Sequence, residues 1–275
     1  MILEKHLNLK KVKKLSTWRR VAISSWKRPR DPQTYGILKF PSGPMNDAIK
    51  EFRDKTGKKL TTTHFVAKAL ATAIERNPEI NCLVRGSTLY QRESVDIFMQ
   101  VSLDEAGRDL SGLVIRDAPK KSLEEIIEQV SKDAKNLRDG KDKTFKKVKK
   151  SIMTTPLFAM RFIIGALDTL LYRFNIWSPL MGVQKDPFAS AMISNVSQFG
   201  IEHGFVPIPA ISHVPIIFAI FQAKDEAVVI NGEVKVQNTL SIGVTLDHRV
   251  IDGVYAGKIT KVLREIFENP NIILN

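Results

Sequence analysis

The chain is poor in the residues that build disulfide frameworks and metal sites. Its 275 residues include a single cysteine, Cys82, and five histidines. One cysteine excludes an internal disulfide framework and is consistent with a reducing compartment, so we expect Cys82 to be a small core residue. No combination of histidine, cysteine and aspartate has the spacing of a zinc site, and we therefore expect no metal.

The sequence also lacks a secretory signal and an uninterrupted apolar segment. The start, MILEKHLNLKKVKKL, has no sustained apolar run followed by small residues, so we expect the cytoplasm or an organelle matrix. Residues 152–177 are mostly apolar but contain Arg161, Asp168 and Arg173. A transmembrane helix needs roughly 20 predominantly apolar residues with few or no charges. We therefore do not expect residues 152–177 to cross a membrane.

Basic residues are in excess, and 43% of the chain is hydrophobic, which is typical of a globular protein. There are 42 lysines and arginines against 29 aspartates and glutamates, a formal net charge of +13. This charge favours anionic partners such as coenzyme A, acidic proteins, phospholipid headgroups or nucleic acid. Zinc-finger spacing, an RNP-like aromatic motif and a helix-turn-helix pattern are all missing, so we expect no nucleic-acid partner.

The most informative stretch is residues 239–270. Apolar residues alternate with small or polar ones up to Asp247, which predicts a strand with one buried face. From Val254 the apolar residues recur at helical spacing until Asn269 and Pro270. The chain must therefore turn sharply around His248.

His248 is a candidate general base. Its unperturbed pKa lies near neutral pH, and a carboxylate, Asp252, follows four residues later. Gly253 is expected to adopt a backbone angle that other residues resist. For an arbitrary pair of this spacing, a turn histidine held by its neighbours is the alternative.

The string DHRVIDG at residues 247–253, followed by a helix ending in ENP, resembles the active-site signature of a known family. This is the catalytic domain of the dihydrolipoyl acyltransferases of 2-oxoacid dehydrogenase complexes. FVAKALATAIERNPEIN, at residues 65–81, is similar to a core helix of that family and the loop after it. The resemblance implies an α/β fold, a chloramphenicol acetyltransferase-like sandwich of a mixed sheet with packed helices. It also implies a homotrimer with active sites between neighbouring subunits.

The resemblance further implies the residues of the site. Ser194, in the string ISN, corresponds to the serine that stabilises the oxyanion, and Asn195 supports it. Arg19, with Arg20 as the second choice, would pair with Asp252 and hold the turn. Without the resemblance, a serine in a strand usually bonds only to backbone, and both arginines could be surface charge.

The implied activity is transfer of an acyl group between coenzyme A and a thiol such as dihydrolipoamide, or another nucleophilic acceptor. His248 would deprotonate the acceptor. The alternative is a catalytically idle trimeric or larger scaffold with a helix that docks on a membrane or a partner. We divide the chain into a basic arm, residues 1–15, and a catalytic domain, residues 16–275. With no lipoyl attachment site recognised, the chain is either part of a longer protein or a free-standing relative.

Two segments depart from the family pattern. The loop in DEAGRDLSGLVIRDA, residues 104–118, is remodelled, and an insertion occupies about residues 140–189, with KKVKK at 146–150. The insertion is open to three interpretations: a packed helix or two, the wall of a long acyl-chain pocket, or an interfacial helix that contacts a membrane through residues 146–177.

The C-terminal apolar residues also have two interpretations. In the resembled family a hydrophobic terminus joins trimers into larger shells, so Ile272, Ile273 and Leu274 could form such a contact. An end packed on its own domain is the alternative. Dehydrogenase-complex enzymes are further expected partners.

Overall fold

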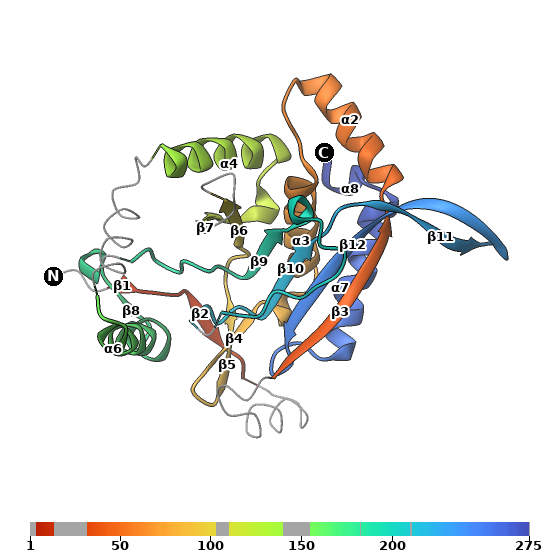
Figure 1. Ribbon diagram of the computed structural model, residues 1–275. Helices are drawn as coiled ribbons and strands as arrows, with labels where there is room; N and C mark the ends of the chain where they lie inside the picture. Colours follow the sequence, from red (N-terminus) through yellow and green to blue (C-terminus); the bar gives the residue numbers. More distant parts are fainter. Residues whose placement is uncertain are drawn as a thin grey trace.

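The computed structural model describes residues 4–13, 32–102, 110–139, 155–181, 183–209 and 211–274. Its centre is a mixed seven-stranded sheet in the order β11-β12-β10-β9-β6-β7, with β3 also paired to β12 (Figure 1). The strands are β3 (Gln33–Pro41), β6 (Ile97–Ser102), β7 (Leu110–Ile115), β9 (Ala191–Asn195), β10 (Ile216–Ile220), β11 (Lys224–Ile230) and β12 (Glu233–Asp247). β9 runs parallel to β10 and β6, and the other pairs are antiparallel.

Helices cover one face of this sheet, and their ends carry the expected signals. They are α2 (Gly43–Thr56), α3 (Thr62–Glu75), α4 (Leu123–Arg138), α7 (Gly253–Glu268) and the short α8 (Asn271–Leu274). Ser122 and Glu125 form a capping box at the start of α4, and Thr61 forms another with His64 in α3. Gly57 ends α2 in a left-handed conformation, φ +70°. The mixed sheet with packed helices is therefore confirmed.

The core lies between these helices and alternate residues of the strands. Ile97 and Met99 of β6, Ala191 and Ile193 of β9, and Phe218 of β10 are all buried in it. Buried large apolar side chains each contribute about 1.5–3 kcal/mol relative to exposure. Cys82 belongs to the same core, as predicted. We call the side of the sheet that these helices cover, with Ile97, Ile193 and Phe218 on it, the helix face.

The intervening residues point to the opposite side, which we call the open face. Because side chains alternate along a strand, Phe98 and Gln100 share this face with Met192 and Ser194 on the neighbouring strand. A coil also crosses it: a Cβ added at Gly243 would lie 2.2 Å from the carbonyl oxygen of Gly204. Glycine is thus required where that coil meets β12.

The part of the insertion that the structure describes packs beside the open face. Helix α6 (Leu157–Asp168) continues into a π-helical turn, η3 (Thr169–Arg173), and β8 (Ile176–Trp177) then pairs with β1 (Glu4–Lys5). Leu171 and Tyr172 form a small cluster with Leu7 and Leu83. Leu83 belongs to a second sheet of β2 (Leu9–Lys11), β5 (Thr88–Arg92) and β4 (Cys82–Arg85). The insertion therefore packs against the N-terminal strand β1 and against β4 of the second sheet.

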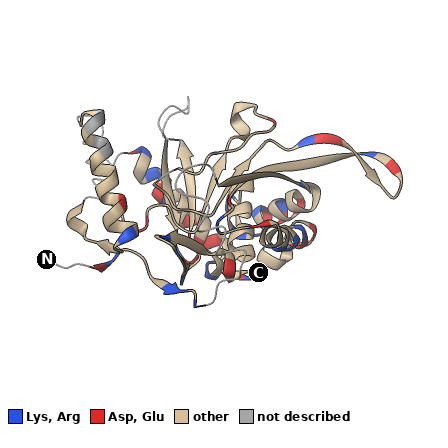
Figure 2. Ribbon diagram, turned by 90° about the horizontal axis from the view of Figure 1, so that it is seen from below, with Lys and Arg blue, Asp and Glu red and all other residues tan. Residues whose placement is uncertain are grey.

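Four short helical turns complete the described fold. They are η1 (Pro78–Ile80), η2 (Ala118–Lys120), η4 (Pro179–Met181) and η5 (Ser197–Phe199). Across all the ranges given above, no helix is long and apolar enough to cross a membrane. The helices under the sheet carry residues of both charge signs (Figure 2).

The β11–β12 hairpin extends well beyond the body of the molecule (Figure 1). Its turn has positive φ at Asn231 (52°) and Gly232 (84°), as a two-residue hairpin turn requires. Val229, Val234 and Val236 on this hairpin are 71%, 74% and 79% exposed. Exposed apolar side chains gathered on a projecting ribbon are typical of a contact surface.

The C-terminal residues pack on their own domain. Ile273 is buried in the main core, and Ile272 and Leu274 pack against it. The structure therefore supports an end packed on its own domain for Ile273, because a side chain buried in its own core is not available for contact with another trimer.

Candidate active site

The histidine turn begins where the longest strand ends. β12 finishes at Asp247 after pairing with β10 on one edge and β3 on the other, so His248 stands at the end of a strand that is held on both sides. Its backbone N–H donates to the carbonyl oxygen of Pro32 at 2.8 Å. The predicted position of His248 at a strand end is confirmed.

Two residues beside His248 stabilise the turn, and neither was singled out from the sequence. Asp247 accepts a hydrogen bond from the backbone N–H of Arg249 at 3.0 Å, and its carboxylate also accepts from the Arg249 guanidinium, with the shortest distance 2.6 Å. Both nitrogens Nε and Nη2 take part, so the ion pair is bidentate. The signal was present as the charged residues on either side of His248.

Asp252 caps the helix that follows. Its Oδ1 accepts hydrogen bonds from the N–H groups of Val254 and Tyr255, both at 3.1 Å, so the carboxylate lies at the positive end of α7. The reason predicted for Gly253 is wrong: it is the first residue of α7, and its φ is not positive. The turn itself lies at residues 248–250, closed by the N–H groups of Val250 and Ile251 donating to the carbonyl oxygen of Asp247, and Asp252 precedes the helix with an extended backbone (φ −96°, ψ −176°).

Ser194 lies on the open face of β9 and is 9% exposed. Its hydroxyl donates to Oε1 of Gln100 on the adjacent strand β6 at 2.6 Å. Gln100 was not predicted from the sequence, although a lone amide in the apolar string IFMQVS of β6 was a usable signal. A serine hydroxyl held by one acceptor can turn to donate to another oxygen.

Asn195 fastens the end of β9 to its surroundings. Its amide nitrogen donates to the hydroxyl of Thr63 in α3 at 2.8 Å. Its Oδ1 accepts from the N–H and the hydroxyl of Ser197, at 3.0 and 2.7 Å. These bonds fix the strand end next to Ser194.

Within one chain, His248 and Ser194 lie far apart. Ser194 stands beside Ala219 in the sheet, and Ala219 stands beside Gly243. His248 follows Gly243 by five residues. With about 3.4 Å per residue and about 4.8 Å between strands, the separation is about 20 Å. These two residues can act on one carbonyl group only if they come from different subunits.

Several predicted positions fall outside the described residues. They are Arg19, Arg20 and the KKVKK segment at 146–150, and most of the loop that opens the 104–118 string. The side chain of Arg161 is likewise outside them. Asp168, another of the three charged residues named in this segment, is placed: its Oδ1 lies 2.6 Å from Nε2 of His213.

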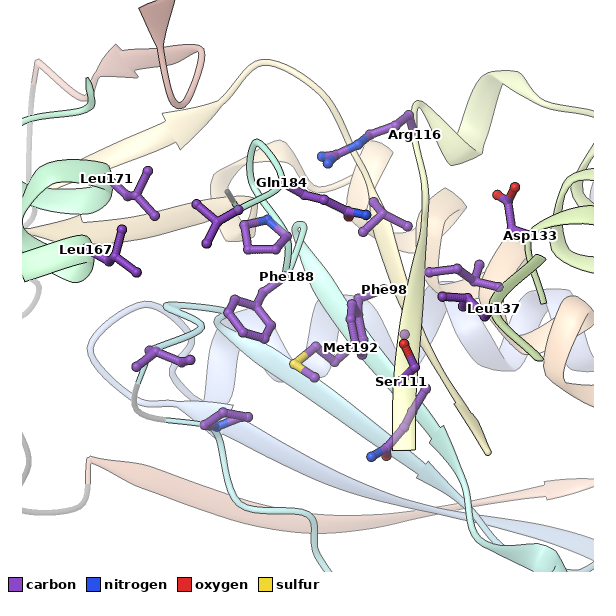
Figure 3. Close-up of a pocket in the computed structure, with 18 of the residues that line it drawn as sticks. Phe98, Ser111, Arg116, Asp133, Leu137, Leu167, Leu171, Gln184, Phe188 and Met192 are labelled. Atoms are coloured by element: carbon purple, nitrogen blue, oxygen red, sulfur yellow. The ribbon is translucent and has the colours of Figure 1, made fainter. Parts of the chain in front are cut away.

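A cavity of about 930 Å³ lies between the open face, the last turns of α4 and the insertion (Figure 3). Phe98, Gln100 and Met192 line it from the sheet, and Leu167 and Leu171 from the insertion. In the part of the chain that the structure covers, no cluster of three or more histidine, cysteine or acidic side chains could hold a metal ion.

The sequence comparison identifies the chain's family. The family model described as "2-oxoacid dehydrogenases acyltransferase (catalytic domain)" matches residues 11–154 and 188–275. This chain belongs to that family. Residues 155–187, which contain α6, η3 and β8, lie between the two matched segments.

Curated relatives are similar over most of this chain. The dihydrolipoyllysine-residue acetyltransferase component of the acetoin cleaving system of Bacillus subtilis is 26% identical over 80% of the chain and 44% of the relative. The dihydrolipoyllysine-residue succinyltransferase component of the 2-oxoglutarate dehydrogenase complex of Rickettsia typhi is 25% identical over 83% of the chain and 46% of the relative. The chain thus spans about half the length of these relatives.

Solved structures of the family share the fold. A dihydrolipoamide acetyltransferase of Azotobacter vinelandii superposes with a TM-score of 0.65 at 20% identity, over 89% of this chain and 84% of that one. A probable dihydrolipoamide acetyltransferase of Listeria monocytogenes gives 0.62 at 17% identity, over 94% of both chains. At these identities the likeness establishes the fold.

Proposed function

We propose that this domain transfers an acyl group between coenzyme A and a thiol of the dihydrolipoamide type. The observation that carries the proposal is the placement of His248 at the end of the longest strand, β12, of an acyltransferase-family fold. Membership of this family favours the acyltransferase over the idle scaffold. Dehydrogenase-complex enzymes are the proposed partners.

The chemistry follows from the two candidate side chains. His248 takes the proton of the acceptor thiol, and the thiolate sulfur forms a bond to the carbonyl carbon of the acyl thioester. The carbonyl π electrons move to oxygen, which accepts a hydrogen bond from Ser194 in place of Gln100. When the carbonyl re-forms, the carbon–sulfur bond to coenzyme A breaks, and the coenzyme A thiolate takes the proton back from His248. The net basic charge suits the phosphates of coenzyme A.

The active site is proposed to lie between subunits of a homotrimer. The separation of about 20 Å between His248 and Ser194, deduced from the strand register, supports this arrangement. The exposed valines of the β11–β12 hairpin offer apolar surface for such an assembly.

A relative provides further support for the residues. In the Azotobacter vinelandii acetyltransferase, the roles of a serine, a histidine and an asparagine in the catalytic mechanism have been investigated, and the asparagine follows the histidine by four residues. Asp252 follows His248 at the same interval. We propose that Asp252 supports the histidine turn, with Arg19 as its partner.

The proposal is tested by mass-spectrometric detection of acyl transfer from acyl-coenzyme A donors to dihydrolipoamide. The wild-type protein should form acyl-dihydrolipoamide, and His248→Ala should reduce the rate by about 10²–10⁴-fold because it removes the general base. A folded trimer that transfers no acyl group from any donor, or a His248→Ala variant with the wild-type rate, would refute the proposal.

A further inference from the structure

We propose that the cavity beside the insertion binds the aliphatic chain of the acyl group, so that the preferred donor is a thioester with an acyl chain several carbons longer than acetyl. The inference rests on the proposed acyltransferase function and specifies its substrate class. We call this space the insertion cavity; its walls include Phe98 and Met192 from the sheet and Leu167 and Leu171 from the insertion.

The insertion cavity has the size and the surface of a site for an apolar group. Its volume, about 930 Å³, lies near the upper end of the range of about 300–1,000 Å³ found for small-molecule sites. Leu167 and Leu171 form one wall, and Phe98 and Met192 face them from the sheet (Figure 3). An acyl chain matches this surface, because it needs no hydrogen bond and gains from leaving water.

The insertion cavity adjoins the candidate oxyanion site. Gln100, which lines the cavity, accepts the hydrogen bond of the Ser194 hydroxyl at 2.6 Å. Met192 precedes Ser194 by two residues on β9, so both point to the open face. A carbonyl group held at Ser194 therefore has the cavity beside it, in the direction of Met192 and Phe98.

The wall made by the insertion is fixed to the rest of the protein. Oδ1 of Asp168, at the end of α6, lies 2.6 Å from Nε2 of His213. Nε of Arg85 donates to the carbonyl oxygen of Arg173 at 2.6 Å. The indole N–H of Trp177 donates to Val183 at 3.0 Å. A wall held at several points keeps the cavity preformed, and less conformational entropy is then lost on binding.

Gly112 sets the position of the aromatic ring on the opposite wall. A Cβ added there would lie 1.9 Å from the Cζ atom of Phe98, so the Phe98 ring can lie against β7 only because residue 112 is glycine. Both residues line the cavity. A residue larger than glycine at position 112 would displace the Phe98 ring from β7.

The inference predicts selectivity by chain length. Burial of one methylene group is worth about fourfold in an equilibrium constant, so each added carbon should raise affinity or kcat/KM by up to about fourfold until the cavity is full. Acetyl donors would leave the cavity empty and gain nothing from it.

The test measures kcat/KM for acetyl-, butyryl-, hexanoyl-, octanoyl- and decanoyl-coenzyme A, with dihydrolipoamide as acceptor. Ile164→Trp places a large side chain in the cavity from α6, at a residue that lines it and is 38% exposed. Phe162→Trp is the matched control, because Phe162 is 79% exposed on the other side of the same helix. If Ile164→Trp fails to fold, Leu167→Phe replaces it in the test, because it reduces the space in the cavity from the same wall.

Support requires that wild-type protein prefer octanoyl to acetyl by at least tenfold, that Ile164→Trp abolish this preference while retaining acetyl transfer, and that Phe162→Trp keep it. A preference for acetyl that Ile164→Trp does not change would overturn the inference and leave the acyltransferase function intact.

Binding to the inactive His248→Ala variant, measured by calorimetry, separates the two proposals. Affinity that rises with chain length, and is lost when Ile164→Trp is added, would support the cavity even if no transfer occurred. Affinity independent of chain length, together with a change of oligomeric state in Ile164→Trp, would show that a neighbouring subunit fills the cavity and would overturn the inference.

Discussion

The two faces of the central sheet are built from the same strands but do different work. On the helix face, Ile97, Met99 and Ile193 are sealed under α3 and α4 in a continuous apolar core. On the open face, the intervening residues Gln100 and Ser194 are polar and joined by a hydrogen bond. The alternation of a strand thus separates the residues that stabilise the fold from those placed for chemistry.

The largest expected effect is a loss of stability, and it should differ between a phenylalanine on the helix face and one on the open face. Phe218→Ala should lower the free energy of unfolding by about 3–5 kcal/mol, because Phe218 is fully buried on the helix face. Phe98→Ala should cost distinctly less, because its ring borders the insertion cavity. Urea denaturation of both variants measures the difference, and equal losses would show that the two faces are packed alike.

Ser194→Ala should act on the rate and leave the fold nearly unchanged. Removal of one oxyanion donor costs about 10²–10³-fold in kcat. The side chain is small and its partner, Gln100, remains beside the cavity. Steady-state kinetics with circular dichroism as a folding control test this expectation. A variant with wild-type kcat would remove Ser194 from the mechanism.

The free energy of unfolding should fall as the pH falls, because of a buried histidine in α3, one of the helices that cover the helix face. Burial lowers the pKa of His64 from 6.5 to about 4, and its Nδ1 accepts the capping hydrogen bond of the Thr61 N–H. Because the folded pKa lies below the unfolded value, the unfolded chain binds more protons in this window, and stability is lost as pH falls from 6.5 towards 4. The loss attributable to His64 should be about 2 kcal/mol between about pH 7 and about pH 5.

Thermal unfolding across this pH range should show a smaller decrease for His64→Gln than for wild type. Glutamine can accept the same capping bond and does not titrate. If the two proteins lose stability in parallel, His64 does not contribute to the acid sensitivity.

The smallest effect is expected at Gln100. Gln100→Leu removes the acceptor that the Ser194 hydroxyl must leave in order to donate to the oxyanion. Such a hydrogen bond contributes about 1 kcal/mol, so kcat should rise by roughly tenfold or less. Gln100→Glu, which keeps an acceptor, should not show this rise. A lower kcat in Gln100→Leu would mean that Gln100 is needed to hold the Ser194 side chain in place.

The features that can be predicted from the sequence are mostly those determined by residues close together in the chain. The capping box at Ser122, the Asn231-Gly232 turn and the strand that ends before His248 were all readable, because neighbours in sequence determine them. The bidentate pair of Asp247 with Arg249 was also local but needed the turn geometry to become visible. Gly253 was misread because a glycine after a turn can equally well begin a helix.

The missed features depend on contacts between distant segments. Gln100 and Ser194 are joined only because β6 and β9 pair in parallel, and Asp168 meets His213 only because α6 packs beside the open face. Neither pairing has a local signature. The insertion cavity was one of three interpretations from the sequence, and only the folded chain shows which residues line it.

The most direct test of the shared site mixes two inactive variants. His248→Ala and Ser194→Ala proteins, unfolded together in equal amounts and refolded, should regain about a quarter of wild-type activity in a cyclic homotrimer, because one site in four then receives an intact histidine and an intact serine from neighbouring subunits. Each variant refolded alone should keep no more than about 1% of the wild-type activity. If the refolded mixture has no more activity than the variants alone, although mixed trimers form, His248 and Ser194 do not act together across a subunit interface.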